Sequence, residues 1–119
     1  MRRFVYSLFA LCALSTTAMA EINTSLSEGF NMGAGRWQCG KVIEIAEKRP
    51  PAEFGQVVGW VLGSWSMATA VREESFVGIV ETVGATKIFE ATIGECRKVP
   101  PEIMLFRVVN TMIERTKAP

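Results

Sequence analysis

Cysteine placement constrains the fold of this chain more than any other feature. Cys12 lies in an apolar N-terminal stretch, whereas Cys39 and Cys96 lie far apart in a segment of mixed composition. In an oxidising compartment such a pair forms a disulfide by default, and closing so long a loop disfavours the unfolded chain by roughly 4 kcal/mol. The chain has no histidine, and two cysteines alone cannot build a structural zinc site. We therefore predict a Cys39–Cys96 disulfide and no metal site.

The N-terminus has the pattern of a secretory signal peptide. Arg2 and Arg3 precede the apolar residues 4–14, and a small-x-small pattern ends at Ala20. Positive charge, apolar stretch and small-residue site in this order are typical of a cleaved signal peptide. A transmembrane anchor is the alternative, but polar residues interrupt the apolar run before the cleavage site. We therefore expect residues 1–20 to be removed on export, and Cys12 with them.

The charge distribution excludes one class of partner. All 12 acidic residues are glutamates, and the lysines and arginines beyond the N-terminal segment are scattered singly or in adjacent pairs. A basic stripe that could follow a phosphate backbone is missing, so we expect no nucleic-acid partner. The exported part, a single domain of roughly 100 residues, buries about 65% of its unfolded surface and benefits from a covalent crosslink.

Apolar spacing divides the exported part into a lead-in and an all-α domain. Residues 21–35 mix small and polar residues without an apolar period and predict a flexible lead-in. Residues 36–119 predict a small domain of four helices, because apolar positions recur three and four apart. Residues 75–83, rich in β-branched side chains, are expected to be an extended connection. Pro100 and Pro101 are expected at the start of the last helix, where a missing N–H is tolerated. The four helices are expected at residues 37–49, 52–74, 85–97 and 102–115.

The second predicted helix is the most apolar part of the exported chain. No charged residue occurs between Glu53 and Arg72, a length at the lower edge of what could span a bilayer. Polar residues, glycines and a one-sided apolar stripe favour a buried helix of a soluble domain over a membrane anchor. Gly55, Gly59 and Gly63 recur every four residues, so one side of the helix carries no side chains. Two interpretations of this side stay open: close packing within the monomer, or self-association.

Few residue types suited to catalysis remain after export. Without its first 20 residues the chain has no His, Asp or Tyr, so a serine triad lacks its base, and we expect neither an enzyme nor a cofactor. Glu73 and Glu74 could form an acid–base pair, but helix neighbours point about 100° apart, which favours a solvated pair at a helix end. Trp37, Trp60 and Trp65 could stack on a sugar or peptide, but helical spacing favours the core.

Four sequence features recur in this order in a known family. Trp37-Gln38-Cys39 opens the first predicted helix, and Val58-Gly59-Trp60 lies in the glycine-rich second helix. Residues 79–83 form the link, and Cys96 closes a later helix. Across residues 36–115 this arrangement resembles the HdeA/HdeB family of acid-stress chaperones from the bacterial periplasm.

The resemblance implies a periplasmic, four-helix HdeA-like domain with one disulfide that is a homodimer near neutral pH. It implies exposure of apolar surface in acid and binding of unfolded or acid-damaged periplasmic proteins as clients. The surface for clients or for a second copy is assigned to Val58, Gly59, Trp60, Leu62 and Gly63. Since the chain has no histidine, its pH response must come from carboxylates, below about pH 4.

A second class of function fits the same chain. Small periplasmic immunity or inhibitor proteins against secreted toxins are also short helical disulfide proteins, with one cysteine early and another before the last helix. They usually carry more cysteines than the two expected here. An adjacent toxin gene favours this binding module, and a solitary gene induced by acid favours the chaperone.

Overall fold

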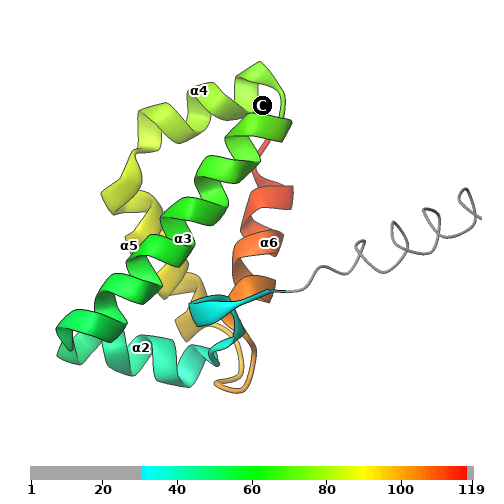
Figure 1. Cartoon of the computed structure of the whole chain (residues 1–119). Helices are drawn as coiled ribbons and strands as arrows, with labels where there is room; N and C mark the ends of the chain where they lie inside the picture. Colours follow the sequence, from blue (N-terminus) through cyan, green and yellow to red (C-terminus); the bar gives the residue numbers. More distant parts are fainter. Residues whose placement is uncertain (1–30, 118–119) are drawn as a thin grey trace, which may run out of the picture. The chain divides into compact units, whose positions relative to one another are not determined.

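The structure, a computed structural model, describes residues 31–117. The predicted signal peptide and most of the predicted lead-in lie outside the described residues. Within residues 31–117 the chain is helical, with one isolated bridge between Gln38 and Met104 and no strand. The predicted all-α class is confirmed, with five α-helices rather than four. Figure 1 shows the elements: η1 (Gly33–Arg36), a short 3-10 helix, then α2 (Cys39–Lys48), α3 (Pro51–Val71), α4 (Glu74–Val83), α5 (Ala85–Arg97) and α6 (Leu105–Arg115).

The long helix α3 is the centre of this domain and packs against η1 and each of the other α-helices. It begins with Pro51, where the missing N–H costs no helical hydrogen bond. Its buried residues fall on one stripe, as the apolar spacing predicts: Val57, Val61, Trp65 and Ala68. None of the helices between residues 31 and 117 is long and apolar enough to cross a membrane.

The predicted disulfide is confirmed and joins α2 to α5. Cys39 is the first residue of α2, and Cys96 lies in the last turn of α5. Their Cα atoms are 5.2 Å apart, and both side chains are fully buried. The crosslink therefore fixes two helices that are distant in sequence and pack along one another.

The prediction of an extended connection over residues 75–83 is wrong, because these residues form helix α4. The β-branched side chains lower the helical propensity only slightly, and tertiary contacts override such a weak preference. Phe76 supplies that contact. Its fully buried ring stacks on Trp65 of α3, with centroids 6.0 Å apart and planes 5° from parallel.

The last helix begins at Leu105 rather than at Glu102, so the prolines precede the helix instead of forming its first turn. The residues before α6 pair with the start of α2. Cys39 N donates to Ile103 O at 2.7 Å, and Leu105 N donates to Trp37 O at 2.9 Å. These hydrogen bonds need an extended backbone, so α6 begins only after the paired residues.

The end of the predicted lead-in is ordered structure. Residues 33–35 belong to η1, and Ala34 and Gly35 are buried. A Cβ on Gly35 would overlap the Trp60 indole, so a residue without a side chain is required for this close approach. Small residues that indicate flexibility in the sequence serve here for close packing.

Candidate functional site

The structure spreads the five residues assigned to a client or dimer surface over three sides of α3. Val58 and Leu62 are half-buried and face α5, Gly59 and Gly63 are exposed, and Trp60 is half-buried against η1. The two glycines lie between the aliphatic pair and the indole around the helix. These residues therefore form a band across α3 rather than one pocket.

The glycines of α3 face away from the rest of the described chain. At Gly55, Gly59 and Gly63 an added Cβ would meet no heavy atom within 4 Å. Close packing against another element, one of the two interpretations left open by the sequence, is therefore not found among residues 31–117. Each glycine costs about 1 kcal/mol relative to alanine in a helix interior, and no contact in residues 31–117 offsets that cost. Self-association stays a prediction.

The exposed side of α3 carries no charge from Phe54 to the end of the helix. In Figure 1 this helix crosses the front of the domain. Apart from Glu53, its exposed residues are uncharged, and two of them, Met67 and Val71, are large apolar side chains with 69% and 79% of their surface exposed. We call this surface the small-residue face; it consists of Gly55, Gln56, Gly59, Gly63, Ser66, Met67 and Ala70.

Apolar hollows border the small-residue face on the side of α5. One, of about 260 Å³, lies where Phe54, Val58 and Leu62 meet Phe89 of α5. The rings of Phe54 and Phe89 pack edge to face, with centroids 5.8 Å apart. A second hollow, of about 330 Å³, continues from Leu62 toward α4. A small separation of α3 from α5 would therefore expose several aliphatic and aromatic side chains together.

A further apolar cavity of about 180 Å³, partly open to solvent, lies among α3, α4, α5 and α6. Trp65 borders it, and the indole Nε1 of this tryptophan is buried without a hydrogen-bond partner. Trp65 is thus in the core, as predicted, while Trp37 and Trp60 are half-buried at its edge. The sequence did not indicate this cavity, because one wall is α4. The lining residues are Trp65, Ile79, Val80, Val83, Ile88, Ala91, Met112 and Thr116.

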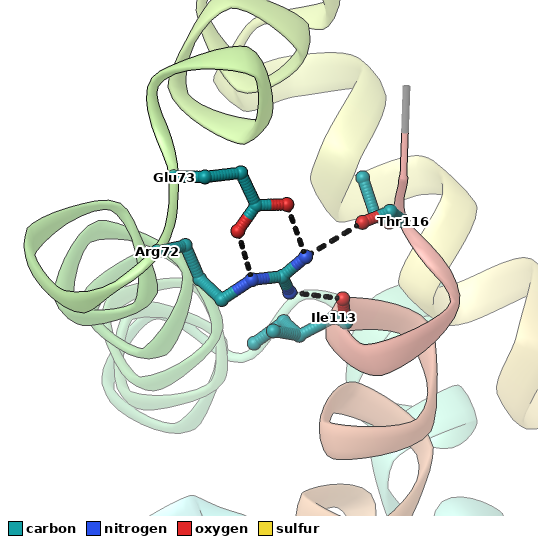
Figure 2. Close-up of polar contacts among 4 residues, drawn as sticks. All are labelled: Arg72, Glu73, Ile113 and Thr116. Atoms are coloured by element: carbon teal, nitrogen blue, oxygen red, sulfur yellow. Dashed lines mark hydrogen bonds and ion pairs between the residues drawn. The ribbon is translucent and has the colours of Figure 1, made fainter. Parts of the chain in front are cut away.

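Glu73 and Glu74 are both exposed at the start of α4, as predicted. Glu73 in addition accepts two hydrogen bonds from the Arg72 guanidinium, from Nε at 2.8 Å and from Nη2 at 2.9 Å. The same guanidinium donates to the backbone oxygens of Ile113 at 2.8 Å and Thr116 at 3.0 Å (Figure 2). Arg72 therefore connects the start of α4 to the end of α6.

The contact with Arg72 changes the pKa of the Glu73 carboxyl. The hydrogen bonds from Arg72 lower the pKa of Glu73 from its usual value of 4.5 to about 2, helped by a backbone hydrogen bond within Glu73 and by the charge of Lys117. A second pair lies within α2, where Lys48 donates to Glu44 at 2.6 Å and lowers the pKa of that exposed carboxyl. Unlike Arg72 with Glu73, this second pair joins no two elements.

Among residues 31–117 no group of three or more His, Cys, Asp or Glu side chains lies close enough to hold a metal ion. The Arg72 contacts are structural in geometry, since they connect the ends of helices. Comparison of the chain with family models, with curated proteins and with solved structures finds no match.

Proposed function

We propose that this protein is a periplasmic acid-stress chaperone of the HdeA/HdeB type. It is exported with loss of residues 1–20, works by binding rather than by catalysis, and needs no cofactor. At low pH it exposes apolar surface and keeps unfolded or acid-damaged periplasmic proteins from aggregating. The observation that carries the proposal is the uncharged small-residue face of α3, bordered by the half-buried Val58 and Leu62.

The packing between α3 and α5 supports a surface that becomes available on loosening. Phe54, Val58, Leu62 and Phe89 are half-buried, so each keeps part of its apolar surface near solvent. Each fully exposed aliphatic or aromatic side chain offers roughly 1.5–3 kcal/mol of burial to a client. A slight opening therefore creates a binding surface without complete unfolding.

Charge supports the second half of the role, which is to keep the complex dispersed. Protonation of the 12 glutamates leaves every lysine and arginine without an acidic counterpart. Since no histidine is present, this change occurs in the acid range where glutamates titrate, below about pH 4. Like-charged complexes repel one another, so net positive charge opposes their coalescence.

Near neutral pH we propose a homodimer in which a second copy covers the small-residue face. Helix faces without side chains allow two backbones to approach closely. The exposed Met67 and the neighbouring glycines are then buried in the closed dimer and released together in acid.

Variants on opposite sides of the domain test the proposed client surface. Val58→Ser with Leu62→Ser is expected to weaken protection of an aggregation-prone client at pH 2–3, because apolar surface is lost beside α3. Val99→Ser with Ile103→Ser is the matched control, since both are half-buried aliphatic residues beside the groove between α5 and α6. Client light scattering measures protection, and an equal loss in both double variants would contradict the assignment to α3.

Charge variants separate solubility from binding. Substituting Lys41 or Lys48 by Gln removes an exposed positive charge from α2. We expect client binding to persist while the complex sediments more readily. Loss of binding itself in these variants would contradict the division of roles.

The alternative proposal is a small periplasmic binding module, such as an immunity or inhibitor protein against a secreted toxin. One observation favours it: Met67 and Val71, one turn apart on α3, are 69% and 79% exposed in the folded domain. Exposed apolar patches of this kind mark protein–protein contacts. A folded partner bound at pH 7, with no protection of clients in acid, would support this alternative.

A further inference from the structure

Helix α4 is the helix held by the fewest buried residues. Phe76 is its one buried residue, whereas each of the other four α-helices has three or four. At its C-terminal end α4 is joined to α5 through Gly84 alone, with φ of 82°. Glycine adopts this conformation without a steric penalty. A single-residue joint of this kind can act as a hinge.

The side of α4 that faces the domain lies over the cavity of about 180 Å³. Ile79, Val80 and Val83 of α4 form one wall, and Met112 of α6 and Thr116, the residue after α6, form part of another. Side chains that line a void lose the dispersion contacts that close packing provides. Direct packing between α4 and α6 therefore contributes little to holding α4 in place.

One side chain supplies the missing connection between these helices. The Arg72 guanidinium holds Glu73 through two hydrogen bonds and donates to the Ile113 and Thr116 oxygens at the end of α6 (Figure 2). It also lies 4.3 Å from the centroid of the Phe76 ring. The Arg72 side chain is only 22% exposed. The contact therefore joins the start of α4, its buried ring and the end of α6.

We propose that the Arg72–Glu73 pair is a latch that holds α4 against the end of α6, and that protonation of Glu73 lets α4 swing about Gly84 and widens the apolar cavity. Arginine stays charged at every relevant pH. Once Glu73 is protonated, its carboxyl loses its charge and keeps only one oxygen as a good acceptor, so it holds the guanidinium less firmly and water competes for it. The inference deepens the proposed function by naming the part that opens in acid, and it rests on that function only for the use of the widened cavity.

The groups around Glu73 set the pH at which the latch releases. Arg72 precedes it, Glu74 follows it, and Lys117 lies beyond α6. The pKa of Glu73 is lowered from 4.5 to about 2, first by hydrogen bonds from Arg72. Because the folded pKa is the lower one, the pair stabilises the closed form fully above about pH 4.5. That stabilisation is lost as the pH falls from there toward 2, so the latch releases only in strong acid.

Hydrogen exchange of the disulfide-intact protein tests the latch without any client. In the wild type, α4 amides should lose protection as the pH falls toward 2, after correction for intrinsic rates. Glu73→Gln has the shape of the protonated carboxyl, so its α4 amides should lose protection at pH 5–7, by about tenfold, the effect of losing hydrogen bonds to a charged group. Helices α2 and α5, joined by the disulfide, should keep their protection.

Glu44→Gln is the matched control, because it removes a carboxylate paired with a basic side chain within α2. It should leave α4 protection at the wild-type level. Equal α4 protection in Glu73→Gln and wild type from pH 7 to 2 would overturn the latch. So would loss of protection in α2, α4 and α5 together, since that result indicates global destabilisation. Chaperone activity is not measured, so failure of the proposed function leaves this test unaffected.

Discussion

The contact between Gly35 and Trp60 joins two segments that are distant in the sequence. Gly35 is buried in η1, and its missing side chain leaves room for the indole of α3. Arg72 makes a second contact of this kind, because its guanidinium reaches the backbone at the end of α6. Both contacts depend on the size or charge of one side chain, so single substitutions test them.

Gly35→Ala is expected to destabilise the domain by about 1–3 kcal/mol, the usual effect of added volume at a packed site. A Cβ there overlaps the Trp60 ring, so η1 or the indole must move. Gly78→Ala is the control, because a Cβ at Gly78 of α4 meets no heavy atom within 4 Å. There alanine should stabilise the helix by up to about 1 kcal/mol. Urea unfolding measures both changes, and shifts of the same sign would contradict the packing described here.

At the scale of helices, the length of each apolar pattern decided how well it could be predicted. α3 repeats its apolar spacing over 21 residues, and the predicted range of 52–74 starts one residue later and ends three residues later. α4 has only 10 residues, so local β-branched propensity outweighed the helical spacing. The stacking of Phe76 on Trp65, which favours the helix, is a tertiary contact that local sequence does not reveal.

The candidate surfaces likewise contain some features that local sequence predicts and others that only tertiary contacts decide. Half-burial of Val58 and Leu62 was predictable, since both lie at the edge of the apolar stripe on α3. The exposure of the glycines could not be predicted, because a helix face without side chains suits both close packing and contact with solvent. The contact of Arg72 with Ile113 spans 41 positions, and no sequence spacing indicates that the end of α6 lies beside the α3–α4 junction.

Gly59→Leu tests the small-residue face as a contact between two copies. We expect the wild type to be dimeric near neutral pH and the variant to dissociate at a protein concentration at least about tenfold higher, because a leucine prevents close approach of two backbones. Gly78→Leu is the matched control on an exposed glycine of α4. Sedimentation equilibrium from pH 4 to 8 measures both. A wild type that is monomeric at all concentrations in this range would remove the dimer.

At the scale of the whole domain, two different connections hold opposite ends. The Cys39–Cys96 disulfide fixes α2 to α5 at one end, and the Arg72 contact ties α4 to α6 at the other (Figure 1). The disulfide is insensitive to acid, whereas the pairing of Arg72 with the Glu73 carboxylate weakens when that carboxylate is protonated. The domain can therefore open at one end in acid and stay crosslinked at the other. Such a partial opening is what a reversible acid-activated chaperone requires.

The most direct measurement is light scattering of an aggregation-prone client mixed with a several-fold molar excess of the purified, disulfide-intact protein. At pH 2–3 we predict strong suppression of scattering, accompanied by increased binding of an apolar dye, because protonated glutamates permit the domain to open. At pH 7 suppression should be slight, since the apolar side chains beside α3 are then half-buried. Unchanged client scattering at pH 2–3 would contradict the chaperone account and leave the binding module as the better proposal.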